Sequence, residues 1–363
     1  MPRYSYTCSR YCHWFYRWGN PNCNGKLPPG TMGLPIVGET LQFVVPDAIC
    51  DISPFIRKKM ARYGPIFRTS LFGEKTIVCT DPDINHYIIQ QEGRSVLLWY
   101  TEALNKVFGQ QGILAQHGAI HKHLKNQILR LVGPENLKAN ILTELDALIR
   151  GHLQSWARLA TVDLKKATED MLFDYAARKL ISYDESKTPM KFQENFNAFM
   201  YGLFSFPLDI PGTKYNKCVQ GRKNSMKIIK GIIKERKSSK MSHCDFLNHL
   251  LEEIEREDSF LNEAHVVDMV ILILFAVQET TSTSSTLVLK FISKHPDVLA
   301  ELTKEHEAIL KIRRDNKESD MITWEEYKSM TFTHMVITEL VRLANFGPAL
   351  CRKVIRDVEV NGK

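Results

Sequence analysis

The sequence lacks most of the short motifs that identify nucleotide, zinc and redox sites. It has no G-x-G-x-x-G or G-x-x-x-x-G-K-[ST] phosphate loop and no H-E-x-x-H zinc motif, so it shows no nucleotide cradle of its own. Its eight cysteines include no C-x-x-C pair, and the one close pair is Cys8 and Cys12. Scattered cysteines in a long chain indicate reduced thiols that face the cytosol, not a disulfide framework.

The first eighteen residues also lack an apolar run that could span a membrane. A spanning helix needs about 20 mostly apolar residues, and polar residues and Pro2 interrupt this segment. A secretory signal core is missing as well. The cluster Trp14, Phe15, Tyr16 and Trp18 nevertheless resembles the aromatic belt found at membrane interfaces.

The composition is that of an ordinary globular protein, and the net charge is only mildly basic. The chain is 44% hydrophobic and 25% charged, with a formal charge of +7, which is an ordinary globular balance. So mild a basic excess is no nucleic-acid signature and suits an anionic membrane surface or an acidic protein partner equally well. We find no internal repeat, no low-complexity tract and no boundary between two independent domains.

The residue patterns predict a mainly α fold with a small β-sheet. A basic amphipathic helix is expected over residues 52–63, followed by a hairpin of Ile66–Leu71 and Lys75–Thr80. Asp81-Pro82 then opens another helix. Residues 119–310 follow a nearly continuous helical pattern, and a strand near Arg352–Val360 is expected to join the hairpin's sheet.

Loops and caps are predicted from charge and turn residues. The segment Pro207–Gly212 separates two helices, and the charged runs Lys234–Lys240 and 311–320 are expected to be solvated loops. Thr323 and Glu326 have the spacing of a capping box, in which each side chain bonds the other's backbone amide at the start of a helix.

The segment Met269–Ile292 is the most informative part of the chain. Met269–Val277 is an unbroken apolar run, so we expect a helix buried on nearly all sides, about 30 residues or about 45 Å long. Glu279 and Thr280 follow it, and a buried carboxylate is costly unless a function requires it. Alternatively, the Ser and Thr side chains bond back to carbonyls four residues earlier, and Glu279 finds an ion-pair partner.

Two further groups of polar residues have weaker interpretations. Glu339 and Arg342 share a helix face in an apolar setting, which favours a partly buried ion pair over surface decoration. His117 and His121 share a face if this segment is helical, but no acidic or thiol ligand completes a zinc shell. His121 with Lys125 is better suited to facing an anionic ligand, with a solvated basic face as the alternative.

Together and in this order, these segments resemble the cytochrome P450 family of haem-thiolate monooxygenases. Lys26-Leu-Pro-Pro-Gly30 is similar to the proline-rich hinge after the family's membrane anchor, and Ala276-Val-Gln-Glu-Thr-Thr281 to its oxygen-activation motif, [AG]-G-x-[DE]-T-[TS]. Glu339-x-x-Arg342 matches the family's E-x-x-R pair. The resemblance implies a P450 domain over residues 26–363 and identifies residues 1–25 as the remnant of a membrane anchor.

Three longer runs are similar to family 87 of the plant clan that oxidises sterols and triterpenoids. These runs are Gly30–Phe43, Tyr63–Thr69 and Phe206–Thr213. The resemblance implies a haem cofactor, a hydrophobic small-molecule substrate and electrons from an NADPH–cytochrome reductase. It also implies the cytosolic face of the endoplasmic reticulum membrane, with no nucleic-acid partner.

Roles for individual residues follow from the same resemblance. Thr280 would hydrogen-bond bound dioxygen and help to deliver protons for its cleavage, and Glu279 would relay those protons. Cations facing the haem propionates would make charge-assisted bonds, and Glu339 with Arg342 would lock their helix to a later Arg. The propionate cations would be His121, Lys125 and Arg352, and the substrate pocket would include Phe275, Ala276 and Val277.

Two departures from the family pattern shape the expected activity. Val277 replaces a small Gly, and the sequence stops at Lys363 before a haem loop of the form F-x-x-G-x-R-x-C-x-G. Cys351 lacks the Phe and Gly context of the haem ligand, so we expect an incomplete fold without a thiolate ligand or a thiolate-type Soret band. Hydroxylation would then belong to a longer form. The alternatives are a non-catalytic chain that binds lipid or protein, and an unstable pseudogene product.

Overall fold

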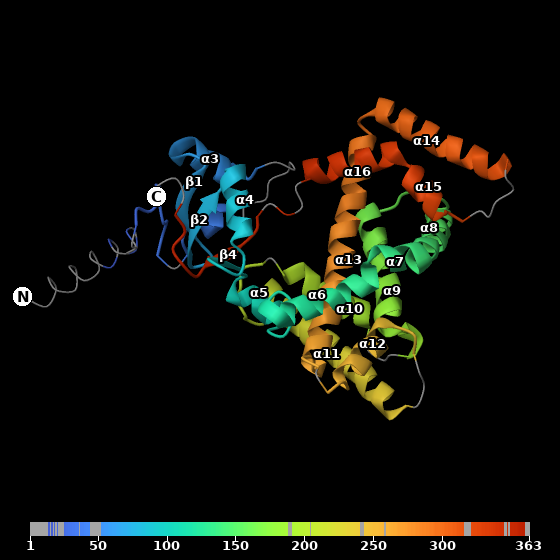
Figure 1. The fold of residues 1–363 in the computed structure, drawn as a ribbon, viewed down its shortest axis with the longest axis horizontal. Helices are drawn as coiled ribbons and strands as arrows, with labels where there is room; N and C mark the ends of the chain where they lie inside the picture. Colours follow the sequence, from blue (N-terminus) through green and yellow to red (C-terminus); the bar gives the residue numbers. More distant parts are fainter. Residues whose placement is uncertain are drawn as a thin grey trace, which may run out of the picture. The chain divides into compact units, whose positions relative to one another are not determined.

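The computed structural model places residues in two compact units. It describes residues 25–359, apart from 36, 44–51, 188–190, 204, 240–242, 258, 316–320, 345–346 and 348, together with Trp14, Tyr16, Trp18 and Asn20. The β-containing unit combines Met1–Thr101 with Gly347–Lys363, and the helical unit spans Glu102–Phe346 (Figure 1). Most of the predicted anchor remnant, residues 1–25, lies outside the described residues.

The β-containing unit is built around the predicted hairpin. Strands β1 (Ile66–Leu71) and β2 (Glu74–Cys79) pair antiparallel, with Leu71 opposite Glu74, which confirms the hairpin. Phe72 and Gly73 adopt positive φ values of 54° and 81° at the turn, a conformation that glycine accepts without strain. The remaining elements are α2 (Thr40–Phe43), α3 (Pro54–Tyr63), α4 (Pro82–Gln90), β3 (Val96–Leu98) and β4 (Arg352–Val354).

The late strand forms where it was expected but in a different sheet. β4 pairs antiparallel with β3, with Leu98 opposite Arg352, whereas the hairpin forms a two-stranded sheet of its own. The prediction that this strand joins the hairpin was therefore wrong. Only three residues make up β3, too short a run to show a strand's alternating pattern in the sequence.

The helical unit holds the main core. Its elements are α5 (Glu102–Phe108), α6 (Gly118–Val132), α7 (Pro134–Asn136), η1 (Leu137–Ile141), α8 (Leu142–Trp156), α9 (Leu164–Ile181), η2 (Glu185–Lys187), α10 (Phe192–Gly202), α11 (Lys214–Ser238), α12 (Phe246–Ile254), α13 (Glu263–Ile292), α14 (Pro296–Asp315), α15 (Trp324–Ser329) and α16 (Thr331–Ala344).

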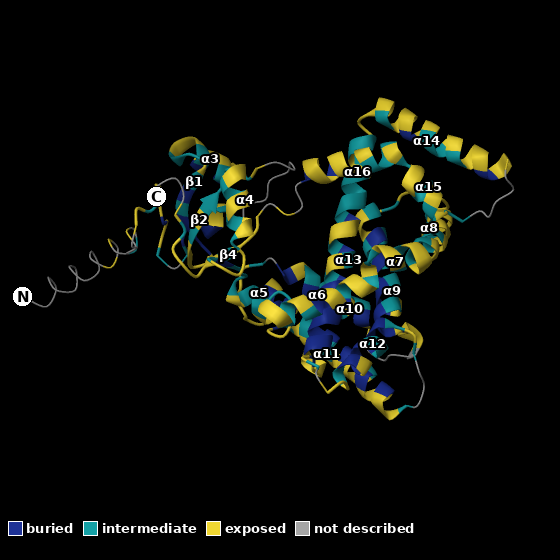
Figure 2. Cartoon of the chain, viewed as in Figure 1, coloured by how far each residue is buried: buried dark blue, intermediate teal, exposed yellow. Residues whose placement is uncertain are grey.

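Helix α13 is the long apolar helix that the sequence predicts. It has 30 residues, begins at a capping box of Asn262 and His265, and is buried from His265 to Leu274. Helices α9, α11 and α12 pack against it, and its later half is mostly half-buried (Figure 2). Among the described residues, α13 is also the one helix that could cross a membrane by length and composition. Because 61% of its most apolar stretch is buried within the protein, that observation is weak evidence for a span.

Helix caps confirm two local predictions. Asp81 accepts hydrogen bonds from the backbone amides of Asp83 and Ile84 at the start of α4, where Pro82 occupies the first turn. Thr323 and Glu326 form the complete capping box at the start of α15. These signals are local, so neighbouring structure did not override them.

The prediction that Lys234–Lys240 and 311–320 are loops was wrong for the first part of each segment, which is helical. Helix α11 continues to Ser238 and α14 continues to Asp315. Each segment contains a buried arginine that binds a carboxylate: Arg236 with Asp245, and Arg313 with Glu326 at 2.7 Å. Because both pairs join different elements, the sequence could not distinguish these cations from solvated ones.

Candidate active site

The middle of α13 turns its polar residues in different directions. Gln278 and Ser282 are buried, whereas Ala276 and Thr280 are exposed one turn apart. The Glu279 side chain is 36% exposed. The expectation that Glu279 and Thr280 are buried was therefore wrong, because their positions are rotated by about 100° and 200° from Gln278.

Both features of the structural alternative are present on α13. The Thr280 hydroxyl donates to the Ala276 carbonyl at 2.6 Å, and Ser284 donates to the Thr280 carbonyl at the same distance. Oε1 of Glu279 lies 3.6 Å from Nζ of Lys165 and accepts a 3.4 Å hydrogen bond from Thr283. These contacts satisfy the polar groups without excluding a function, so the roles of Thr280 and Glu279 stay predictions.

The three predicted pocket residues do not share one face. Phe275 packs edge-on against Phe108 with ring centroids 4.9 Å apart, and Val277 packs on the same core. Ala276 alone of the three is exposed. Consecutive helix residues are about 100° apart, so only Ala276 lies on the same open face as Thr280.

The predicted propionate cations lie on two elements. His121 and Lys125 are one turn apart on α6, half-buried and exposed respectively. Arg352 lies on β4, where its Nε is 2.6 Å from Oε2 of Glu92. They belong to different units, so the structure brings His121 and Lys125 together but does not place them relative to Arg352.

His117 and His123 lie near the predicted cations of α6, and Cys351 precedes Arg352. His117 is the N-cap residue of α6, and His123 lies 3.5 Å from Oε1 of Glu253 on α12. Cys351 is exposed, and its carbonyl accepts a hydrogen bond from the Trp99 amide beside the β3–β4 pair.

Glu339 and Arg342 form the predicted pair with two hydrogen bonds of 2.6 and 2.7 Å. The Arg342 hydrogen bonds lower the pKa of the Glu339 carboxyl. The side chains are 54% and 67% exposed, so the expected partial burial was wrong. On α16 it is Leu340 and Ala344 that are buried, and the pair lies off that face.

Sequence reasoning missed Lys165, the partner of Glu279. Lys165 lies in the first turn of α9, 3.6 Å from Glu279 and 3.3 Å from Glu169. Its pairing with Glu279 depends on α9 packing against α13. No local signal in the sequence reveals such a contact, because the two residues are far apart along the chain.

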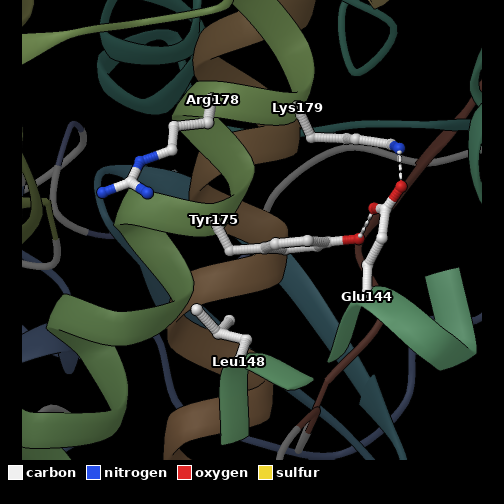
Figure 3. Close-up of a pocket in the computed structure, with 5 residues that line it drawn as sticks. All are labelled: Glu144, Leu148, Tyr175, Arg178 and Lys179. Carbon is white, nitrogen blue, oxygen red and sulfur yellow. Dashed lines mark hydrogen bonds and ion pairs between the residues drawn. The ribbon is translucent and has the colours of Figure 1, made fainter. Parts of the chain in front are cut away.

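An open hollow of about 420 Å³ lies elsewhere on the helical unit, lined by α8 and α9. Figure 3 shows Tyr175 and Lys179 both directed at Glu144, whereas Arg178 points away. Burial, and then the hydrogen bond and charge of Glu144, raise the pKa of Tyr175 far above its ordinary value. The carboxylate is thus already bound by both neighbours, and none of the predicted site residues lines this hollow.

Comparison with known proteins defines the class. The family model for cytochrome P450 matches residues 28–363. A solved structure titled retinoic acid bound cyanobacterial CYP120A1 matches with a TM-score of 0.81 and 26% identity, covering 93% of this chain and 74% of that one. The chain thus has the cytochrome P450 fold and belongs to the cytochrome P450 family.

Plant relatives narrow the similarity. Cytochrome P450 87A3 from Oryza sativa subsp. japonica is 46% identical over 351 residues, covering 96% of this chain and 68% of the relative. Cucurbitadienol 11-hydroxylase from Siraitia grosvenorii is 40% identical over 354 residues, covering 97% of this chain and 74% of the relative. These matches confirm the resemblance to family 87 and a haem-dependent monooxygenase function.

The family and fold imply a haem iron, and the residues on α13 and α6 fit one. Ala276 and Thr280 give α13 an open face of two short side chains with one hydroxyl, which a flat ring can approach closely. His121 and Lys125 provide donors suited to carboxylates. Family membership also implies a redox partner and a hydrophobic substrate.

Proposed function

We propose that the open face of α13 is where a triterpenoid-like substrate is hydroxylated. The likeness to cucurbitadienol 11-hydroxylase supports this substrate class. When bound, haem supplies the iron that activates oxygen. The observation that carries the proposal is the exposure of Ala276 and Thr280 on a helix whose preceding turns are buried, because it leaves one small face open to ligands.

Thr280 would hold a proton at this face. Its hydroxyl now donates to the Ala276 carbonyl, and a hydroxyl has one proton and two lone pairs. Rotation of the side chain would let it donate to a ligand instead. Glu279 would exchange protons with solvent, since its side chain is partly exposed while Lys165 and Thr283 hold Oε1.

The remaining roles concern binding and location. His121, Lys125 and Arg352 would hold the haem propionates, with Arg352 oriented by Glu92. Phe275 and Val277 would support the wall whose open residue is Ala276. We further propose electron supply by an NADPH–cytochrome reductase and association with the cytosolic face of the endoplasmic reticulum.

The test compares three single variants, made in a form of the protein that carries the haem loop, in microsomes that contain a plant reductase, with cucurbitadienol as substrate. Thr280→Ala should lower the hydroxylated product formed per NADPH by at least about tenfold, because a positioned proton donor is lost. Thr280→Ser keeps the hydroxyl and should retain most of the yield. Thr281→Ala is the matched control, since Thr281 is an exposed neighbour rotated away from this face.

Two results would contradict the proposal. If Thr280→Ala and Thr281→Ala behave alike, Thr280 has no special part in proton delivery. If the wild-type protein leaves several triterpenoids unchanged yet oxidises other lipids, the substrate class is wrong.

A further inference from the structure

The positive charge of this chain is concentrated on one helix. Helix α11 contains nine Lys and Arg residues and a single acidic residue, Glu235, so its formal charge is +8 whereas the whole chain carries +7. The rest of the chain is therefore close to neutral. Positive charge concentrated on one helix creates a strong local electrostatic potential. The same net charge distributed evenly over the surface would create a much weaker one.

Five of these lysines form a single exposed row, the lysine row. Their spacing of i, i+4, i+7, i+11 and i+14 places them on one face of the helix over about 21 Å. The opposite face is buried in the core through Tyr215, Cys218, Ser225 and Ile229. The row consists of Lys223, Lys227, Lys230, Lys234 and Lys237, all exposed.

Most lysines of the row lack the neighbouring carboxylates that usually neutralise a solvated helix face. Surface lysines commonly pair with carboxylates at i+3 or i+4, and like charges at that spacing repel. Lys237 bonds Glu263 at 2.6 Å, but among the described residues the other four form no ion pair. Asp268 attracts Lys230, but its carboxylate is buried and bonds Arg222 at 2.6 Å. An external anionic surface would relieve this repulsion.

A cationic cavity adjoins the start of the row. It has a volume of about 230 Å³ and is lined by Lys106 and Val107 from α5 and by Val219, Arg222, Lys223 and Met226 from α11. Nη2 of Arg222 donates to Asp268, and Nη1 faces the Met226 sulfur, a poor acceptor. The buried Nε has no acceptor among the described residues. The cavity thus has a cationic lining and room for a small anionic group, and one of its lining residues, Arg222, has a donor without an acceptor.

Exposed apolar side chains continue this surface. Nζ of Lys106 lies 3.6 Å from Oδ2 of Asp209, in the segment that precedes α11. In that segment Phe206, Leu208 and Ile210 are 59%, 46% and 52% exposed. A lipid bilayer presents both anionic headgroups and an apolar layer, whereas an acidic soluble protein would match chiefly the lysines.

We propose that α11 docks on an anionic phospholipid surface, with the lysine row against the headgroups and one headgroup phosphate or carboxylate in the cavity beside Arg222. This proposal assigns the membrane association proposed above to one surface. It does not depend on catalysis, because vesicle binding is measured without turnover.

The test compares two fourfold variants of equal charge change. The row variant changes Lys223, Lys227, Lys230 and Lys234 to Gln. The control variant changes four other exposed lysines to Gln, on α13, on α14 and in the turn between them: Lys290, Lys294, Lys304 and Lys311. Sedimentation is measured with vesicles of phosphatidylcholine, with and without phosphatidylserine. The row variant should bind the phosphatidylserine vesicles at least about tenfold more weakly than wild type, and the control variant nearly as well as wild type.

Further arms separate the sources of the anion and guard against misfolding. Equal losses in both variants, or none in the row variant, would overturn the proposal. The proposal would also be overturned if the lysine row bound inorganic phosphate or polyglutamate but the protein did not bind vesicles. On the wild-type protein itself, added salt should release phosphatidylserine vesicles. Binding that persists in salt would refute the electrostatic docking even if the row variant failed to fold.

Discussion

At the scale of single residues, the contact between Lys165 and Glu279 determines how the candidate relay acid is held. Burial alone would lower the pKa of Lys165, but the charges of Glu279 and Glu169 raise it above its ordinary value. Lys165 therefore stays protonated at neutral pH and keeps an ammonium 3.6 Å from Oε1 of Glu279. This makes Lys165 a candidate positioning residue for the proposed proton delivery.

We predict that Lys165→Met lowers the product formed per NADPH several-fold, because Glu279 loses the cation that holds its carboxylate. The free energy of unfolding should fall by less than about 1 kcal/mol, since the pair is partly exposed to solvent. Lys165→Arg should restore the yield. The measurement is the yield of product per NADPH consumed, taken from about pH 6 to about pH 8, where histidine titrates but Lys165 stays protonated. Unchanged coupling in Lys165→Met would reduce the contact to surface decoration.

The candidate site was predictable residue by residue only where a motif is local. Thr280 and Glu279 stand out because polar residues interrupt an apolar run, and the sequence alone identifies them. Their exposure was not predictable, because it depends on which side of α13 the neighbouring helix α9 covers. Lys165 was missed for the same reason, since helix packing brings it to Glu279.

At the scale of elements, the junction of α11 and α12 shows how a tertiary contact extends a helix. Arg236 donates to Oδ1 of Asp245 at 2.5 Å and to the Ile181 carbonyl at 2.8 Å. Asp245 also accepts from Ser182 and from the Asn248 amide, as the N-cap of α12. Burial would raise the pKa of Asp245, but these hydrogen bonds, led by Arg236, lower it below its ordinary value.

We predict that Asp245→Asn lowers the free energy of unfolding by about 3 kcal/mol at pH 7, because it leaves the Arg236 charge buried without a counter-charge. A carboxyl whose pKa is depressed on folding stabilises above its unfolded value of about 4 and loses that effect as pH falls through the folded value. The difference between wild type and variant should therefore shrink below about pH 4.

Urea unfolding at about pH 7 and below about pH 4 measures the difference in stability between wild type and Asp245→Asn. Glu263→Gln is the control, because it breaks the exposed pair with Lys237 and should cost less than about 1 kcal/mol. A difference for Asp245→Asn that is independent of pH would show that the carboxylate charge is not the source of stability.

Elements with strong local signals formed as predicted. The hairpin, the Asp81 cap, the capping box at Thr323 and the 30-residue α13 follow from turn residues, caps and hydrophobic periodicity. The ends of α11 and α14 did not, because their charged sequences favour loops unless one arginine in each is buried against a distant carboxylate. The short strand β3 gave no periodic signal at all.

At the scale of the whole molecule, the β-containing unit is assembled from both ends of the chain, whereas the helical unit is continuous in sequence. Pairing β3 with β4 closes a very long loop, which costs conformational entropy. Glu92 offsets part of that cost by joining both strands. Its Oε1 accepts from the Leu98 amide at 2.7 Å, and its Oε2 binds Arg352.

We therefore predict that Arg352→Met speeds hydrogen exchange at the β3 and β4 amides several-fold, because a partly buried ion pair contributes modestly to local stability. Amides of the buried segment Ile271–Leu274 in α13 should exchange at the wild-type rate, since they belong to the helical unit. Hydrogen–deuterium exchange with peptide-level mass spectrometry measures both, and Arg356→Met, an exposed cation nearby in sequence, is the matched control. If the α13 amides accelerated as much as those of β3, the two units would have to open together, and Arg352 would act on the stability of the entire chain instead of on one sheet.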